Sequence, residues 1–391
     1  MRLAAYSDDP YVRARGRVAA VMPFALFLGG LRQSVDGLVL LGRVDPDAAA
    51  GAIASAVDLP ETVEFAELPW WEDLSRPVGM LRALPGSLRT FWRVAGEVDA
   101  VLLFGPSPMG LAFAAITRLR RRRLALGVRM DYVSYIAHRH PGRRSLAGIA
   151  GALDGAWRLV SRTAPTVVVG AGLAQRYRRA HRLLEVWVSL VSDADVAAPA
   201  RGAPGADGPV RVLTVGRVDT EKNPLLLADV LADLRAGGED WTITVCGDGP
   251  LLEALRDRAA RLGVADHLDL RGFVAPSAGL GELYRDADMF LHVSWTEGMP
   301  QVLVEAWASG LPVVATDVGG VPAAVGADGG LLVAPGDARA AADALRRVAT
   351  DEALRARLRA GSLDRARQHT LERETARITT FLAADDAKAP A

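Results

Sequence analysis

Short apolar segments alternate with helical segments along the second half of the chain, and no other feature constrains the fold as strongly. Apolar runs at Val210–Val215, Trp241–Cys246 and Met289–Val293 are each followed, after a loop, by a stretch with helical spacing. Such a series is typical of a parallel sheet with helices packed against its faces. The first half shows the same alternation, so the sequence predicts an α/β protein throughout.

The expected elements can be given as residue ranges. In the first half, strands are expected at 2–6, 37–44, 63–68, 100–104, 124–128, 166–169 and 185–191, with helices at 109–120 and 145–162. In the second half, strands are expected at 210–215, 241–246, 267–270, 289–293, 312–315 and 331–333, with helices at 223–235, 251–262, 281–285, 301–308, 338–348, 352–360 and 368–382. Asn223 is expected to cap the helix that follows it, with Pro224 at the first helical position.

Length and composition predict two domains. The 391 residues suffice for two domains of ordinary size, each burying its own core. The segment 196–209 (VAAPARGAPGADGP) is rich in Ala, Pro and Gly, which is typical of a linker. We therefore predict an N-terminal domain over 1–195, a C-terminal domain over 210–365, and a terminal helical segment, 366–391, with a frayed end.

Charge is distributed unevenly although the whole chain is neutral. Residues 118–144 contain nine arginines and a single acidic residue, Asp131, which indicates an anionic partner on the N-terminal half. The run Arg118–Arg123 (RLRRRR) suits an anionic membrane surface or an anionic lipid-linked acceptor. The alternative is a solvated face, with cations favoured at a helix C-terminus. Nucleic acid is not predicted as a partner, because neither interleaved aromatics nor a binding motif accompany the basic segment.

Cysteine content and hydropathy indicate a cytoplasmic protein, with peripheral contact at the inner face of the membrane as an option. Cys246 is the single cysteine, so no disulfide can form within the chain. Met1–Pro10 lacks a signal-peptide pattern, and the longest apolar run, Val18–Leu31, is too short to span a bilayer. The six histidines are scattered, and no metal site or cofactor is predicted.

The segment Ser294–Pro322 carries the strongest signal for a ligand site. Glu297 and Glu305 are eight residues apart, which on a helix is a rise of about 12 Å and a turn of about 80°, so both carboxylates are expected on one side. The N–H groups of Met299, Gln301 and Val302 are expected at a helix N-terminus, where unpaired donors suit a diphosphate. Taken singly, the alternatives are a helix-start carboxylate for Glu297 and an ordinary polar helix position for Glu305.

A second candidate site follows the strand 210–215. Gly216 lets the backbone approach a ligand closely, and Arg217 and Lys222 bring two cations to the strand's carboxyl edge. Lys222 is one of only two lysines in a chain with 44 arginines. The alternative is that both cations are solvated turn residues.

Gly247 and Gly249 form a third glycine-containing turn. They lie between a strand and a helix in the run GDGP, which predicts a cradle of backbone donors for a phosphate. The alternative is that the glycines serve close packing of the turn alone.

These motifs together resemble the donor site of the retaining family-4 glycosyltransferases, of the type called glycosyl transferases group 1. The match comprises EGMPQVLVEAWASGLPVVAT at 297–316, the G-R-x(4)-K spacing at 216–222, GDGP at 247–250 and GFV at 272–274. The resemblance is strong over residues 210–335 and weak before 196. It implies the glycosyltransferase-B fold: two Rossmann-like domains that face each other across a cleft, with the last helix crossing back to the first domain.

The resemblance also implies roles for individual residues. Arg217 and Lys222 would hold the donor's diphosphate and stabilise its charge as it leaves, Glu297 would face the donor sugar, and these three are the candidate catalytic residues. Glu305 would bind the ribose hydroxyls, and a backbone contact of Val274 would lie beside the nucleobase. The remaining donor-binding candidates are Gly216, Gly247, Gly249, Gly298, Met299, Pro300, Gln301 and Val302.

The N-terminal half departs from the family pattern in two places. Ser7–Pro10 stands where the family has a glycine-rich loop, and Arg129–Asp131 stands where the family has a histidine. Arg129 and Asp131 are therefore candidates for the acceptor or sugar side, the alternative being a strand-end salt bridge. His292, on a strand leading to the site, is expected to be a satisfied core histidine.

The implied activity is a metal-independent, retaining transfer of a sugar from a nucleoside-diphosphate-sugar to a hydroxyl of a glycan, lipid-linked or small-molecule acceptor. Such a reaction fits polysaccharide or glycolipid biosynthesis. The alternatives are a nucleotide-sugar epimerase of the same architecture and a non-catalytic nucleotide-sugar-binding protein. No general base, donor base, donor sugar or acceptor is predicted.

Overall fold

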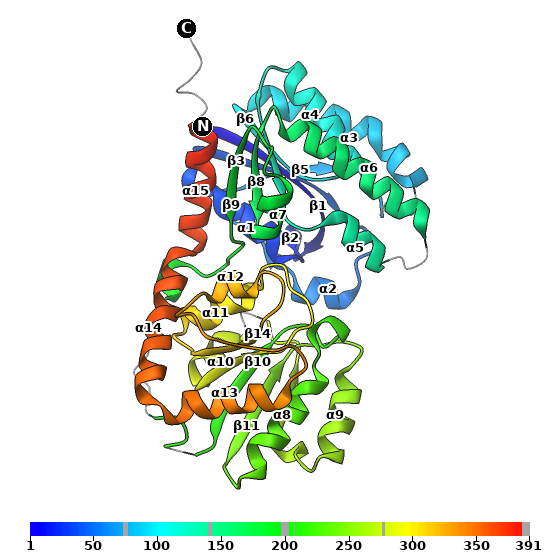
Figure 1. The fold of residues 1–391 in the computed structure, drawn as a ribbon. Helices are drawn as coiled ribbons and strands as arrows, with labels where there is room; N and C mark the ends of the chain where they lie inside the picture. The colour runs from blue at the N-terminus through cyan, green and yellow to red at the C-terminus, as the bar shows by residue number, and fades with distance from the viewer. Residues whose placement is uncertain (73–76, 140–142, 197–202, 207, 276–277, 385–391) are drawn as a thin grey trace. The chain divides into compact units, whose positions relative to one another are not determined.

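The computed structural model describes residues 1–391 except 73–76, 140–142, 197–202, 207, 276–277 and 385–391. The chain forms two compact units, Met1–Leu190 together with Leu371–Ala391, and Val191–Thr370. Each unit has its own sheet (Figure 1). Much of the segment expected as a linker, and the end expected to fray, lie outside the described residues.

The first unit is built on a nine-stranded sheet. Its main path is β4-β2-β1-β6-β7-β8-β9, with β3 paired to β1 and β5 paired to β3. The strands are β1 (Arg2–Ala14), β2 (Arg17–Ala20), β3 (Gly37–Val44), β4 (Val57–Asp58), β5 (Glu64–Leu68), β6 (Ala100–Gly105), β7 (Arg123–Val128), β8 (Pro165–Val169) and β9 (Arg182–Val186). The pairings of β2 are antiparallel and the others are parallel, as a βα series requires.

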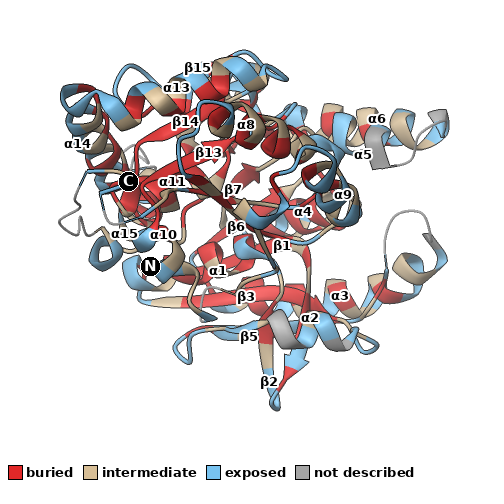
Figure 2. Ribbon diagram, turned by 90° about the horizontal axis from the view of Figure 1, so that it is seen from below, coloured by how far each residue is buried: buried red, intermediate tan, exposed pale blue. Residues whose placement is uncertain are grey.

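Helices bury an apolar core against each face of this sheet, so the sheet lies between helical layers (Figure 2). The helices are α1 (Pro23–Gly30), α2 (Ala50–Ser55), α3 (Pro77–Glu97), α4 (Pro108–Leu119), α5 (Tyr132–Arg139), α6 (Arg144–Ser161), α7 (Ala171–Arg176) and α15 (Leu371–Ala383). One core includes Phe91 of α3 stacked on Phe113 of α4 at 4.0 Å. The other includes Phe27 of α1 and Ile378 of α15, so the end of the chain completes the first unit's core.

Two departures from the predicted elements in this unit have local causes, and a third is a difference in strand bounds. The first strand continues to Ala14 because the register shift between Tyr6 and Pro10 absorbs Ser7–Pro10 within the strand. Helix α3 was not predicted, because Pro85 lies inside it and proline disfavours a helix interior. The bounds of the strand expected at 185–191 are wrong, because β9 begins at Arg182 and ends at Val186.

The second unit is a six-stranded parallel sheet in the order β12-β11-β10-β13-β14-β15. The strands are β10 (Val210–Val215), β11 (Trp241–Cys246), β12 (Leu268–Gly272), β13 (Met289–His292), β14 (Val313–Thr316) and β15 (Leu331–Val333). The helices are α8 (Leu225–Ala236), α9 (Leu252–Arg261), α10 (Leu280–Asp286), α11 (Gln301–Ala308), α12 (Val321–Val325), α13 (Ala338–Thr350) and α14 (Glu352–Gln368). The α/β fold with two parallel-sheet units is therefore confirmed.

Candidate active site

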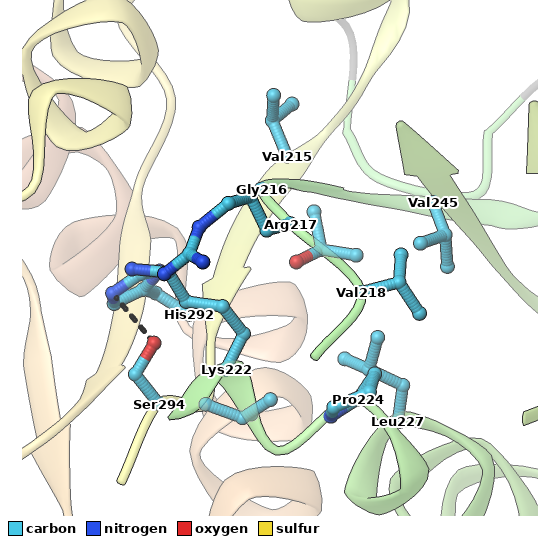
Figure 3. Close-up of a pocket in the computed structure, with 12 residues that line it drawn as sticks. Val215, Gly216, Arg217, Val218, Lys222, Pro224, Leu227, Val245, His292 and Ser294 are labelled. Atoms are coloured by element: carbon cyan, nitrogen blue, oxygen red, sulfur yellow. Dashed lines mark hydrogen bonds between the residues drawn. The ribbon is translucent and has the colours of Figure 1, made fainter. Parts of the chain in front are cut away.

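The candidate residues of the second unit lie where two adjacent parallel strands end. β10 and β13 are neighbours, so the loops that follow them leave the same edge of the sheet. The Trp295 N–H donates to the Glu221 carbonyl at 2.8 Å and ties the two loops together. A pocket opens here, with the polar side chains of Arg217, Lys222, His292 and Ser294 on one side and aliphatic side chains on the other (Figure 3).

The loop after β10 is ordered by Asp219. Its Oδ1 accepts the N–H groups of Glu221 and Lys222 at 3.1 and 3.2 Å, which starts a 3₁₀ turn over Thr220–Lys222. Asn223 closes this turn in the left-handed region, with φ at 50°. The prediction that Asn223 caps the next helix is therefore wrong: Pro224 holds the N-cap position of α8, and no side chain caps it.

Lys222 and Glu297 form an ion pair across the two loops. Lys222 Nζ lies 2.5 Å from Glu297 Oε1. The same oxygen accepts the Ser294 hydroxyl at 2.7 Å and lies 2.8 Å from His292 Nε2. The structure thus brings together two of the predicted catalytic residues with two side chains from the end of β13.

This cluster determines the protonation of Glu297. Burial raises the pKa of the carboxyl, but the His292 hydrogen bond and the charge of Lys222 outweigh it and lower the pKa to about 2. Glu297 is therefore a carboxylate at neutral pH. Because so acidic a group takes up a proton poorly, it is suited to accept hydrogen bonds or face positive charge, and it is a weak general base.

Arg217 is oriented by different partners. Its guanidinium pairs with Asp219 and Glu221, each at 2.6 Å, and its side chain is 64% exposed. Exposed pairs of this kind are weak, so an anionic ligand could draw the side chain away from them at little cost. Arg217 lines the same pocket as Lys222, which keeps both cations at one edge of the sheet.

The prediction that Glu297 and Glu305 share one side of a helix is wrong. Helix α11 begins at Gln301, so Glu297 lies in the loop before it and only Glu305 is helical. Glu305 Oε2 accepts the phenol of Tyr284 at 2.7 Å. Burial raises the pKa of Glu305, and the Tyr284 hydrogen bond opposes that rise.

The glycines of the GDGP turn have a packing role. A Cβ on Gly247 would lie 1.7 Å from the Gly216 carbonyl oxygen, and one on Gly249 would lie 2.4 Å from the Val218 carbonyl oxygen. The Gly247 N–H donates to the Gly272 carbonyl at 2.7 Å, and the Gly249 N–H donates to Asp248 Oδ1 at 2.7 Å. These contacts match the alternative of close packing, and both N–H groups already have acceptors within the protein.

The other donor-binding candidates lie on neighbouring loops of the same unit. Gly298 is exposed, Met299, Gln301 and Val302 are half-buried, and buried Pro300 holds the N-cap position of α11 without a side-chain cap. Gly320 packs on this loop, since a Cβ there would lie 1.8 Å from the Gly298 carbonyl oxygen. Val274 follows the end of β12.

Arg129 and Asp131, in the first unit, form strand-end ion pairs. Arg129 lies 2.5 Å from Asp9 Oδ1, and Asp131 lies 3.0 Å from Arg176 Nη1. Asp131 also accepts the N–H groups of Val133 and Ser134, at the start of α5. These contacts are the alternative given for both residues, and their role toward an acceptor remains a prediction.

The arginine run at the end of α4 is partly engaged by α3. Arg120 donates to the Trp92 carbonyl and stacks over the Trp92 ring, at 4.5 Å from its centroid. Arg122 donates to the carbonyls of Ala95 and Gly96, in the last turns of the same helix. Part of the run therefore caps a helix C-terminus. No helix in the described part of the chain is long and apolar enough to span a bilayer.

Sequence reasoning did not find Asp219, Tyr284 and Ser294, and it treated His292 only as a core residue. One signal was available for the last two. His292 and Ser294 are two residues apart at a strand end, so they face the same side, five and three residues before Glu297 respectively.

The chain superposes on several solved structures, some of which are glycosyltransferases. The structure of HepE from Anabaena in complex with UDP superposes over 98% of this chain and 100% of its own, with a TM-score of 0.68 at 19% identity. Sucrose-phosphate synthase from Thermosynechococcus elongatus superposes over 100% of both chains, with a TM-score of 0.70 at 16% identity. The fold is therefore the glycosyltransferase-B type.

Sequence comparison finds relatives of the second unit. Residues 200–364 match the model of the family "Glycosyl transferases group 1". D-inositol 3-phosphate glycosyltransferase from Stackebrandtia nassauensis is 39% identical over 40% of this chain and 37% of its own. 2-Deoxystreptamine glucosyltransferase from Streptomyces kanamyceticus is 34% identical over 52% of this chain and 53% of its own. The matches span about half or less of these relatives, and within that segment they confirm the resemblance inferred from the motifs.

Proposed function

We propose that the protein is a retaining glycosyltransferase that moves a sugar from a nucleoside-diphosphate-sugar to a hydroxyl without a metal. The observation that carries the proposal is the Lys222–Glu297 pair at the carboxyl edge of the second sheet. A nucleoside diphosphate needs cations at one end of its site, and its sugar needs a hydrogen-bond acceptor at the other.

The cations and the carboxylate have different roles in the proposed reaction. Lys222 donates one N–H to Glu297, and its two other N–H groups can donate to phosphate oxygens. Arg217 adds a second cation at the same edge, and together they would stabilise the leaving diphosphate. Glu297 stays ionised and faces the sugar, while the departing phosphate takes the acceptor's proton. The solved HepE structures with UDP and with UDP-glucose support a uridine donor as the first to test.

A coupled assay of nucleoside diphosphate release tests the proposal. Donors of several bases and sugars are supplied with and without hydroxyl acceptors, and the anomeric configuration of any product is read by NMR. We expect release that depends on an acceptor, retained configuration, and unchanged turnover in EDTA. An epimerase would change the donor sugar without acceptor, and a binding protein would bind the donor with no turnover.

We also propose that the acceptor is presented at a membrane surface. Exposed Leu119, at the end of α4, and exposed Leu159 of α6 lie close to the arginine run, since Arg118 of α4 bonds to Thr163 just beyond α6. Apolar side chains flanked by arginines suit an anionic bilayer. Co-sedimentation with anionic vesicles, but not with neutral ones, is expected for the wild type. The double variant Leu119→Ser/Leu159→Ser should lose it, and equal binding by both proteins would contradict this role.

A further inference from the structure

The groups around Glu297 converge on one of its two oxygens. Lys222 Nζ, Ser294 Oγ and His292 Nε2 all lie within 2.5–2.8 Å of Oε1. A carboxylate oxygen has two lone-pair sites, so three donors saturate it. Oε2 has no hydrogen-bond partner among the described residues, and it is not one of the buried polar atoms left unpaired, so it keeps contact with solvent. The carboxylate is thus held by one oxygen and open at the other.

His292 and Ser294 are rigid supports for this arrangement. His292 ends β13 and is 4% exposed, and Ser294 is 1% exposed. Thr316, the last residue of β14, donates its hydroxyl to the Ser294 carbonyl at 2.8 Å, which fixes the loop to the sheet. Neither side chain needs to touch a ligand in order to fix Glu297.

We propose that His292 is a positioning residue that, together with Ser294, orients Glu297 so that Oε2 is presented to the donor sugar. The inference rests on the proposed donor site and adds to it a residue that acts through Glu297. The imidazole carries its proton on Nε2, because that nitrogen faces an ionised carboxylate oxygen. Ser294 Oγ, 3.2 Å from the same nitrogen, donates its own hydrogen to Glu297 and accepts part of the Nε2–H bond (Figure 3).

The proposal makes a statement about protonation that a packing role does not. The titratable groups that face Glu297 are Lys222 from the 3₁₀ turn and His292 from β13, and Arg217 beyond them is paired with Asp219 and Glu221. Removing the Nε2 donor takes away a hydrogen bond that favours the carboxylate, so Glu297 becomes easier to protonate. The acid limb of activity, which requires the carboxylate, then moves to higher pH.

Two substitutions at His292 separate positioning from packing. His292→Gln places an amide N–H near the position of Nε2, whereas His292→Phe fills the space without a donor. Ser294→Ala removes the second donor with little change in volume, which keeps a test available if His292→Phe does not fold. His267→Phe, at the amino edge of the same sheet before β12, is the matched control.

Glu297 is first observed without any ligand, by NMR of 13C-labelled glutamate carboxyl carbons. In the wild type and in His267→Phe we expect Glu297 to remain ionised down to about pH 4. In His292→Phe and Ser294→Ala we expect its titration midpoint to rise by about one pH unit, with His292→Gln closer to the wild type. This NMR measurement does not depend on turnover, so it tests the positioning role even if the proposed reaction is wrong.

Steady-state kinetics then connect the orientation to the reaction. We expect His292→Phe to lower kcat/KM at neutral pH by about 10- to 100-fold and to shift the acid limb of the pH profile of kcat/KM to higher pH. We expect His292→Gln to keep most of the wild-type kcat/KM. An unchanged Glu297 titration in both His292→Phe and Ser294→Ala would overturn the inference. So would equal loss in His292→Phe and His292→Gln with an unmoved acid limb.

Discussion

Tyr284 donates its phenolic O–H to Glu305 at 2.7 Å, and this bond gives the second glutamate of the motif surroundings opposite to those of the first. Glu305 faces a neutral donor, and its burial raises its pKa. Glu297 faces Lys222 and His292, and its pKa is about 2. The two carboxyls look equivalent in the sequence. Their contributions to the free energy of unfolding nevertheless change with pH in opposite directions.

Glu297→Gln should destabilise the protein at neutral pH. The pKa of Glu297 falls from 4.5 to about 2 on folding, which corresponds to about 3 kcal/mol of stability above pH 4.5 that is lost as the pH falls toward 2. Urea unfolding at a series of pH values measures it. The difference in free energy of unfolding between wild type and variant should decrease as the pH falls. A difference that is constant with pH would contradict the lowered pKa of Glu297.

Glu305→Gln should show the reverse trend. A carboxyl whose folded pKa is raised stabilises the protein at low pH and loses that contribution as the pH rises through the folded pKa. Glutamine keeps an acceptor for Tyr284, so the variant should gain stability relative to the wild type as the pH rises above the ordinary pKa of a glutamate. The same series of urea unfolding experiments tests this prediction. If Glu305→Gln lost stability relative to the wild type as the pH rises, burial would not raise the pKa of Glu305.

Loss of either cation should reduce turnover strongly. Lys222→Ala and Arg217→Ala are each expected to lower kcat by about 10²–10³, the scale of one stabilising donor on a leaving group. Arg235→Ala removes a pair with Asp240 and a bond to the Trp241 carbonyl, and Arg235 does not line the pocket. It is the matched control and should leave kcat unchanged. Near-normal turnover in Arg217→Ala would remove that residue from the site.

Gly216 and Gly247 distinguish a ligand contact from packing. Alanine at Gly247 would press on the Gly216 carbonyl, and we expect it to destabilise the protein by about 3 kcal/mol or more. A Cβ at Gly216 meets nothing within 4 Å, so Gly216→Ala should keep its Tm while raising KM for the donor. An unchanged KM in folded Gly216→Ala would mean that no ligand approaches this glycine closely.

The sequence predicted those elements whose ends carry strong local signals. Helix α11 has its expected bounds because Pro300 and the break at Gly310 mark both ends. Strands β10 and β11 also have their expected bounds, since each is an apolar run that ends at a glycine. Helix α3 was missed because its interior proline contradicts the helical pattern that tertiary packing nevertheless stabilises.

The site was less predictable than the fold, because its contacts join distant parts of the chain. Lys222 and Glu297 are separated by 75 residues, and their contact depends on β10 and β13 being neighbours in the sheet. The helical spacing argument failed for Glu297 because it extended a helix through a loop. Motif residues could thus be named from the sequence, whereas the bonds that Tyr284, His292 and Ser294 make to them required the structure.

Calorimetric titration with a panel of nucleoside diphosphates tests the central claim most directly. We expect one of them to bind the wild type and to bind Lys222→Ala at least about tenfold more weakly, because the variant lacks the cation that faces the phosphates. Arg235→Ala should bind as the wild type does. Equal affinity for the wild type and Lys222→Ala, or no binding by any member of the panel, would contradict a donor site built on the Lys222–Glu297 pair.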